Sequence, residues 1–159
     1  MDKLLTIIEK NAQFSNAELA AVLNISEHEV AEKLAEYKKQ GVLVGTKTII
    51  NWEKTDRNLV TALIELKVIP ERNRGFDEIA KTVCAFDEVE TVYLMSGAYD
   101  LAVFVTGKTF KDVALFVATR LAVIDAVQST ATHFILRKYK ESFVSYMDKE
   151  TDEREVTAL

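Results

Sequence analysis

The turn Ser96-Gly97-Ala98-Tyr99-Asp100 carries the residue types that best suit recognition of a small ligand. Gly97 can adopt a positive φ and leaves backbone groups open to a bound molecule. Tyr99 offers an amphipathic ring, and the Asp100 carboxylate can accept from an ammonium group. A plain hairpin turn in which Asp100 bonds its own backbone explains the same residues without a ligand. From the residues alone, the plain turn is the more economical interpretation.

Three small hydroxyl groups follow in a β-rich run that is expected to form the last strand of the same domain. They belong to Ser129, Thr130 and Thr132. Such hydroxyls can donate to a ligand, although β propensity alone also explains threonine in a strand. We assign them, together with the turn, to a candidate effector-binding site.

A second kind of recognition is predicted near the N-terminus, where a helix from Glu27 to Gln40 follows a turn and an earlier helix. In a helix-turn-helix, the second helix enters the major groove of DNA. The candidates near base edges are His28, Glu29, Glu32 and Lys33, and those near phosphates are Ser15, Lys38, Lys39 and Lys47. A three-helix packing module that touches no nucleic acid is the alternative.

The charge of this region opposes ordinary DNA binding. The formal net charge of the chain is −5, and residues 1–60 hold eight Lys and Arg against nine Asp and Glu. Because phosphate contacts dominate DNA affinity, we expect a single subunit to bind DNA weakly or very selectively. The alternative function is a metabolite-sensing assembly protein whose acidic N-terminal domain binds a protein partner.

Signals of catalysis, of a metal site and of a cofactor are missing from the sequence. It contains no phosphate-cradling glycine loop, no GxSxG elbow and no HExxH helix. The single cysteine, Cys84, reads as a small buried hydrophobe, and the two histidines are far apart. His133 is expected to be a packed or hydrogen-bonded interface residue. We therefore predict that the protein is not an enzyme, binds no metal and carries no cofactor.

Composition predicts a folded protein of the cytoplasm. The 159 residues are 48% hydrophobic and 28% charged, with five glycines and one proline. No apolar run approaches the ~20 residues that a transmembrane helix needs. The first residues show no secretory signal, so we expect a cytoplasmic protein with no membrane partner.

The first 40 residues predict three short helices. Two SxxE capping boxes predict where the second and third helices begin. They are Ser15 with Glu18 and Ser26 with Glu29. Asn24 lies where the turn between them requires a left-handed residue. Gly41 ends the third helix, and two β-branched runs from Val42 to Ile50 suggest a hairpin or wing. We take 1–50 as the helix-turn-helix domain and 51–58 as the linker.

From Leu59 the pattern runs strand, helix, strand, and then repeats. The expected strands are Leu59 to Val68, Val89 to Met95, Leu101 to Thr106 and Val127 to Leu136, with helical faces around 76–83 and 110–121. The order βαββαβ predicts a ferredoxin-like domain over 59–140, followed by a tail at 141–159. The fold class is therefore α+β, with a winged helix-turn-helix domain before the ferredoxin-like one.

Both faces of this sheet look apolar, since residues of both parities in its strands are hydrophobic. Two helices cover only one face of such a sheet. An exposed apolar face of that size indicates a protein interface, so we expect sheets to stack in a homodimer. The alternative is that the C-terminal segment folds back as a cover.

Three segments make the chain resemble the Lrp/AsnC (feast/famine) family of transcriptional regulators: Gly41-Val42-Leu43 at the end of the helix-turn-helix, residues 96–101, and residues 127–134. The resemblance implies dimers that assemble into octamers or similar rings. It also implies that amino acids or related metabolites bind between dimers near Gly97 to Asp100 and change assembly or DNA affinity. The chain departs from the family pattern at Asn24, usually glycine, and at Glu29, Glu32 and Glu36, where basic residues are usual.

Overall fold

The computed structural model describes residues 2–69 and 75–147. The chain divides into two compact units, Met1–Thr48 and Ile49–Leu159. Each unit has its own hydrophobic core. The division falls just before the segment 51–58, which includes the 3₁₀ turn η1 (Trp52–Lys54).

The first unit consists of three helices, α1 (Lys3–Lys10), α2 (Asn16–Leu23) and α3 (Glu27–Lys39). Its core is small and takes residues from each helix: Leu4, Leu19, Ala20 and Val30 are buried. The side chain of Asp2 caps α1 by accepting from the Leu4 N–H at 2.8 Å, and it also accepts from the hydroxyl of Tyr37 on α3. That second bond lowers the pKa of Asp2, and it joins the start of α1 to the end of α3.

Both predicted capping boxes are present. The hydroxyl of Ser26 accepts from the Glu29 N–H at 3.2 Å, and the Glu29 carboxylate accepts from the Ser26 N–H at 2.8 Å. Ser15 and Glu18 make the same reciprocal pair at the start of α2. Asn24 adopts the expected left-handed conformation, with φ of 55°. These local signals set where both helices begin and how the chain turns between them.

The hairpin expected between Val42 and Ile50 is wrong for this chain. Gly41 has φ of +71° and ends α3 as predicted, but no strand forms from residue 42 to residue 50 in the described structure. Val44 is 91% exposed and Val42 is 52% exposed, so these two β-branched side chains are not packed in a core. An isolated two-stranded hairpin is marginal in water, and β propensity alone does not form one.

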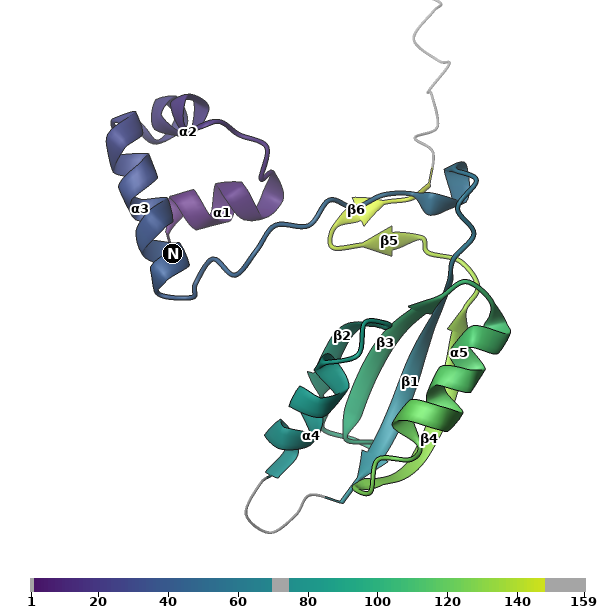
Figure 1. Ribbon diagram of the computed structural model, residues 1–159. Coiled ribbons are helices and arrows are strands. Elements are labelled where there is room, and N and C mark those ends of the chain that lie inside the picture. Colours follow the sequence, from purple (N-terminus) through teal and green to yellow (C-terminus); the bar gives the residue numbers. More distant parts are fainter. Residues whose placement is uncertain (1, 70–74, 148–159) are drawn as a thin grey trace, which may run out of the picture. The chain divides into compact units, whose positions relative to one another are not determined.

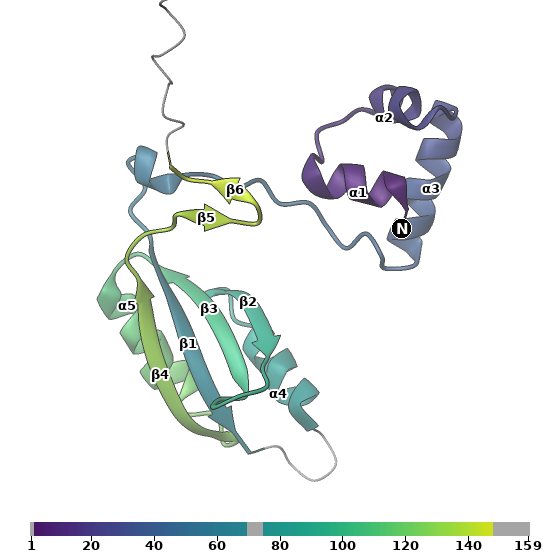
Figure 2. The same ribbon diagram turned by 180° about the vertical axis from the view of Figure 1, so that it is seen from behind.

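The second unit is an antiparallel sheet covered on one face by helices (Figures 1 and 2). The strands β1 (Val60–Val68), β2 (Val89–Leu94), β3 (Leu101–Gly107) and β4 (Val127–Ile135) are arranged in the order β2-β3-β1-β4. The covering helices are α4 (Gly75–Cys84) and α5 (Phe110–Phe116), and α5 continues as the π-helical turn η2 (Val117–Leu121). The predicted α+β class and βαββαβ order are confirmed.

The two faces of the sheet differ more than the sequence suggested. Leu101 and Val103 pair with Leu66 and Ile64, and all four are buried in the core beneath the helices. The opposite face is mixed. Its apolar residues include Leu63, Phe104 and Tyr93, and the rings of Phe104 and Tyr93 form an edge-to-face pair. Its polar residues include Glu65, Lys67 and His133. The expectation of two apolar faces is therefore wrong, because it counted core residues on the open side.

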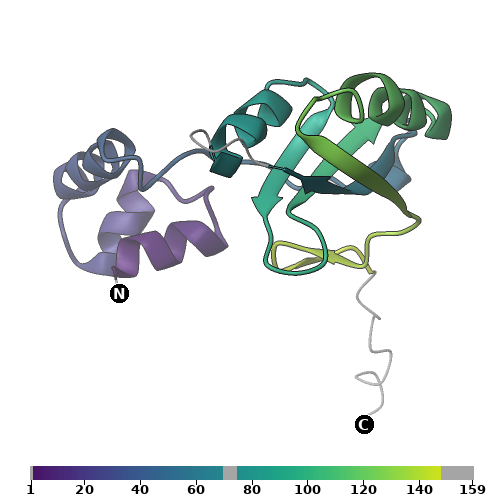
Figure 3. The same cartoon turned by 90° about the horizontal axis from the view of Figure 1, so that it is seen from below.

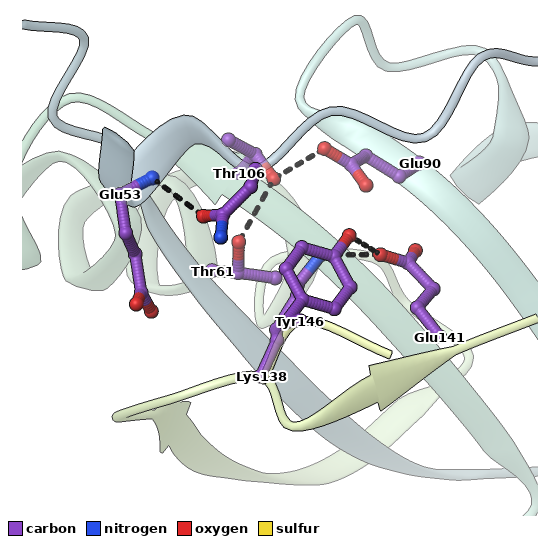
Figure 4. A network of polar contacts seen from close by, with 8 residues as sticks. Glu53, Thr61, Glu90, Thr106, Lys138, Glu141 and Tyr146 are labelled. Atoms are coloured by element: carbon purple, nitrogen blue, oxygen red, sulfur yellow. Dashed lines mark hydrogen bonds and ion pairs between the residues drawn. The ribbon is translucent and has the colours of Figure 1, made fainter. Parts of the chain in front are cut away.

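The chain after β4 forms a small hairpin of β5 (Lys140–Glu141) and β6 (Val144–Ser145). Figure 3 shows this hairpin on the side of the sheet away from α4 and α5. Tyr146 follows it and lies beside Thr61 and Thr106, the pair at one end of the open face (Figure 4). The tail therefore covers that end of the face, and the rest of the face stays open. The predicted tail beyond residue 147 lies outside the described residues.

Replacing the cap residue of α3 tests how far this domain depends on its helix starts. We expect Ser26→Ala to lower the free energy of unfolding of the N-terminal domain by about 1 kcal/mol, because the Glu29 N–H loses its acceptor. Denaturant unfolding of the full chain, followed by circular dichroism at 222 nm, measures the change. Ser96→Ala, a substitution of an exposed serine in a loop, is the control and is expected to be neutral. An unchanged midpoint in Ser26→Ala would contradict the assignment.

Candidate functional site

The outward side of α3 is a narrow stripe of four residues. Val30, Leu34 and Tyr37 pack toward the core of the first unit. At about 100° per residue, the side opposite them carries His28, Glu32, Ala35 and Lys39. All four are exposed. Of the residues predicted to meet DNA, His28, Glu32 and Lys39 therefore share the outward side of α3, and the others do not.

Glu29 and Ser15 both take part in the capping boxes at the helix starts. The Glu29 carboxylate is held by the backbone N–H and the hydroxyl of Ser26, and these bonds lower its pKa. Ser15 is bound in the same way to Glu18, whose pKa is lowered by the Ser15 backbone and hydroxyl. The prediction that Glu29 lies near base edges is therefore replaced by a structural role. Its carboxylate is held at the start of α3 by these bonds.

The remaining predicted basic residues lie on the flanks of α3 and beyond it. Lys33 lies on the flank that also carries Glu29. Lys38 and Lys47 line a groove of about 610 Å³ between α1, α3 and the extended segment 42–47, whose walls include Leu5, Ile8 and Leu34. Sequence reasoning missed this groove, because its far wall is a segment that was expected to be a hairpin.

Asp100 is a structural anchor. Its Oδ2 atom accepts from the backbone N–H of Val68 at 2.8 Å, and the Asp100 N–H donates to the carbonyl of Leu66 at 2.9 Å. Both partners belong to β1, so the carboxylate does not bond its own backbone as the turn interpretation expected. The Met95 N–H donates to the Asp100 carbonyl at 2.8 Å and closes the base of the loop. The loop 96–100 is therefore fixed to the end of the central strand.

Gly97 does not have the positive φ that the sequence suggested. Only Gly41 and Gly75 show a positive φ among the glycines of the described residues. A Cβ built on Gly97 would meet no atom within 4 Å. Ser96, Gly97 and Ala98 are all exposed, and Tyr99 is half-buried. Nothing within the described chain requires glycine here, and the backbone at this position is open to a molecule approaching from outside.

The three hydroxyl residues of β4 are divided between the two faces of the sheet. Thr130 and Thr132 pair with Leu66 and Ile64, which are buried beneath the helices. Ser129 pairs with Lys67 on the open face. The grouping of all three in one site is therefore wrong, because neighbouring strand residues point to opposite sides. Ser129 is the one that shares the open face, at the end of the sheet where Asp100 holds β1.

Two polar features of this domain carried no clear signal in the sequence. On the open face, Nε2 of His133 lies 3.3 Å from Oε1 of Glu65. Beside the hairpin, the Tyr146 hydroxyl donates to Glu141 at 2.6 Å, and Lys138 lies 3.3 Å from the same oxygen (Figure 4). Burial, with this hydrogen bond, raises the pKa of Tyr146 to about 12. The pairing of β1 with β4 brings His133 to Glu65, whereas Lys138, Glu141 and Tyr146 are close in the sequence and meet at the small hairpin.

Neither a membrane-spanning helix nor a cluster of metal ligands is found among the described residues. Across residues 2–69 and 75–147, no helix has the length and hydropathy to span a membrane. Within the same ranges, no three His, Cys, Asp or Glu side chains are grouped so as to hold a metal ion. Cys84 is exposed, in contrast to its predicted burial.

The chain thus joins a unit with the helix-turn-helix arrangement to a ferredoxin-like sheet unit. The model of the Lrp/AsnC ligand-binding domain matches residues 61–144, which is the sheet domain described above. The chain belongs to the Lrp/AsnC family of transcriptional regulators. It is 40% identical over 157 residues to an uncharacterized HTH-type transcriptional regulator of Bacillus subtilis, YugG, covering 98% of this chain and 95% of that one.

Solved structures share the fold at lower identity. A transcriptional regulator of Neisseria meningitidis in complex with L-Met superposes with a TM-score of 0.70 at 19% identity, covering 89% of this chain and 93% of that one. The leucine response regulatory protein LrpA of Mycobacterium tuberculosis gives a TM-score of 0.74 at 18% identity, with coverage of 89% and 97%. The predicted resemblance to the Lrp/AsnC family is confirmed.

The anchor role of Asp100 can be tested without a ligand. In Asp100→Ala the nearly buried Val68 N–H loses its acceptor, so we expect the second domain to lose about 1–3 kcal/mol of its free energy of unfolding. Asp100→Asn keeps an oxygen at the same place and is expected to lose much less. Thermal unfolding of both variants measures the difference. Equal loss in the two variants would show that the charge, and not the hydrogen bond, matters.

Proposed function

We propose that this protein is a DNA-binding transcriptional regulator whose DNA affinity is modulated by an amino acid or a related small metabolite. The observation that carries the proposal is the pairing of a helix-turn-helix, with α3 presenting an exposed outer stripe, and a domain matched by the Lrp/AsnC ligand-binding model. Duplex DNA and a small effector are therefore its proposed partners, and α3 is the proposed recognition helix.

The proposed DNA surface is His28, Glu32 and Lys39 on the outer stripe, with Lys33, Lys38 and Lys47 beside it and the exposed start of α2 at Ser15. Two lysines in the last turn of α3 supply the positive charge of this surface. The same helix carries four glutamates, so few phosphates are neutralised by one copy. Binding then depends on several linked copies, since joining sites multiplies affinity without new contacts.

The proposed effector site is the loop 96–100 with Ser129 at the same end of the sheet. Its base is rigid, because Asp100 is bonded to two backbone groups of β1. Its tip is exposed, and Gly97 leaves room above the backbone. One carboxylate oxygen of Asp100 holds Val68, and the other can accept from an ammonium group of an amino acid. The L-Met bound by the structural neighbour from Neisseria meningitidis supports this class of effector.

The open face of the sheet is the proposed homodimer interface. Leu63 and the edge-to-face rings of Tyr93 and Phe104 supply its apolar part, and Tyr93 is 56% exposed in the single chain. The contact between His133 and Glu65 lies on the same face. A two-fold axis would bring this surface onto its own copy, which is how isologous dimers form. Dimers of this kind are the proposed unit of a higher oligomer, such as an octamer.

DNA binding is tested by fluorescence anisotropy with duplexes selected from a random pool at low salt. We expect salt-dependent binding by the full chain. Lys39→Ala is expected to weaken binding and to reduce the salt slope by about 1, as the loss of one phosphate contact should. Lys111→Ala, an exposed lysine on α5, is the matched control and should leave the slope unchanged. Failure to select any duplex would favour the alternative in which the acidic domain binds a protein.

Effector binding is tested by calorimetry with a pool of the twenty amino acids. We expect heat with the wild type and none with Gly97→Val, because the added side chain fills the space above the loop. The variant should fold as the wild type does, since nothing within the described chain occupies that space. Gly45→Val is the matched control, because Gly45 is equally open but lies in the other domain. Unaltered ligand affinity in Gly97→Val would remove the loop from the site.

A further inference from the structure

Four glutamates on the proposed recognition helix are not equivalent, and only one is placed to meet a base. Glu29 is held in the capping box of α3. Glu36 accepts from the Gln40 amide at 2.8 Å, on the flank of the helix. Glu27 belongs to the first turn and lies toward the core side. Glu32 alone lies on the outer stripe, with its side chain 67% exposed.

The neighbour of Glu32 on that stripe is His28, one helical turn earlier. Its Nε2 atom lies 3.4 Å from Oε1 of Glu32, and its side chain is 81% exposed. This contact involves one carboxylate oxygen, Oε1, and the carboxylate stays exposed on the stripe. His28 is therefore a positioning residue for the carboxylate. Both side chains lie on the outer stripe of α3, the surface that the proposed function places in the major groove.

A carboxylate can only accept hydrogen bonds, and this limits which base it can read. In the major groove guanine presents two acceptors, and thymine presents an acceptor and a methyl group. Adenine presents its N6 amino donor beside the N7 acceptor, which repels a carboxylate. Cytosine presents its N4 amino donor without an adjacent acceptor. An outward carboxylate at the centre of a recognition helix therefore selects cytosine.

We infer that Glu32, oriented by His28, reads a cytosine of the operator. The inference rests on the proposed DNA binding and names a determinant of its specificity. It also gives the acidity of α3 a function. A carboxylate facing the groove opposes binding to every sequence, because it adds to the charge of the phosphates, and only a cytosine offsets that cost. The helix therefore gains selectivity where it loses general affinity.

The test compares the sites that wild type, Glu32→Gln and Glu36→Gln select from a random duplex pool. Each substitution removes one negative charge from α3, so both should raise non-specific affinity equally. We expect an invariant cytosine in the wild-type sites, and its replacement in a duplex to weaken binding about 5- to 100-fold. Glu32→Gln should lose this preference and shift toward adenine, which glutamine reads with two hydrogen bonds. Glu36→Gln should keep the cytosine.

Each outcome of this selection either supports or overturns the role of Glu32 in reading a cytosine. Wild-type sites without an invariant cytosine, or a cytosine preference that survives in Glu32→Gln, would overturn the role of Glu32 and leave the proposed DNA binding intact. Loss of the preference in Glu36→Gln as well would show that the total charge of α3 sets the sequence, which also overturns the inference. A wild type that selects no duplex overturns the proposed function itself. Circular dichroism confirms that both variants keep their helices.

Discussion

At helix starts and strand ends, some backbone N–H groups have no backbone acceptor, and the structure depends on side chains that accept from them. An unpaired N–H removed from water costs about as much as a lost hydrogen bond. In this chain acidic and hydroxyl side chains meet that need repeatedly. Asp2 caps α1, Ser15 and Ser26 cap α2 and α3, and Asp100 accepts from Val68 at the end of β1. Both the helix-turn-helix and the loop at the sheet end are positioned in this way.

The same constraint explains part of the acidic composition. Glu18 and Glu29 are there for the helix starts, and their pKa values are lowered by bonds from Ser15 and Ser26. Groups with a lowered pKa stabilise the fold above their unfolded pKa, and that contribution is lost as pH falls through the folded value. These carboxylates stay ionised and add to the general repulsion of DNA, but they are held at the helix starts by Ser15 and Ser26. For base recognition in the proposed function, the relevant charges are those on the outer stripe of α3, which carries Glu32, His28 and Lys39.

Local features of the chain could be predicted from the sequence, and non-local ones could not. The capping boxes, the left-handed Asn24 and the order of strands and helices all follow from signals within a few residues. The partner of Asp100 lies 32 residues away, and the pairing with β1 decides that Ser129, and not Thr130, lies on the open face. The segment 42–50 shows a third limit. Its β-branched residues favour a strand, but a strand forms only where a partner and an apolar surface are available.

A rigid loop base has a consequence for how an effector could act. A ligand shifts an equilibrium only by as much as it binds one state better than another. The base of the loop 96–100 is fixed to β1 by two hydrogen bonds, so its own movement is a poor source of that difference. The exposed tip offers a different source, because a ligand there alters the surface that another copy meets. In the proposed function, DNA binding follows the number of linked copies, so an effector that changes assembly changes DNA binding with no signal carried through the chain.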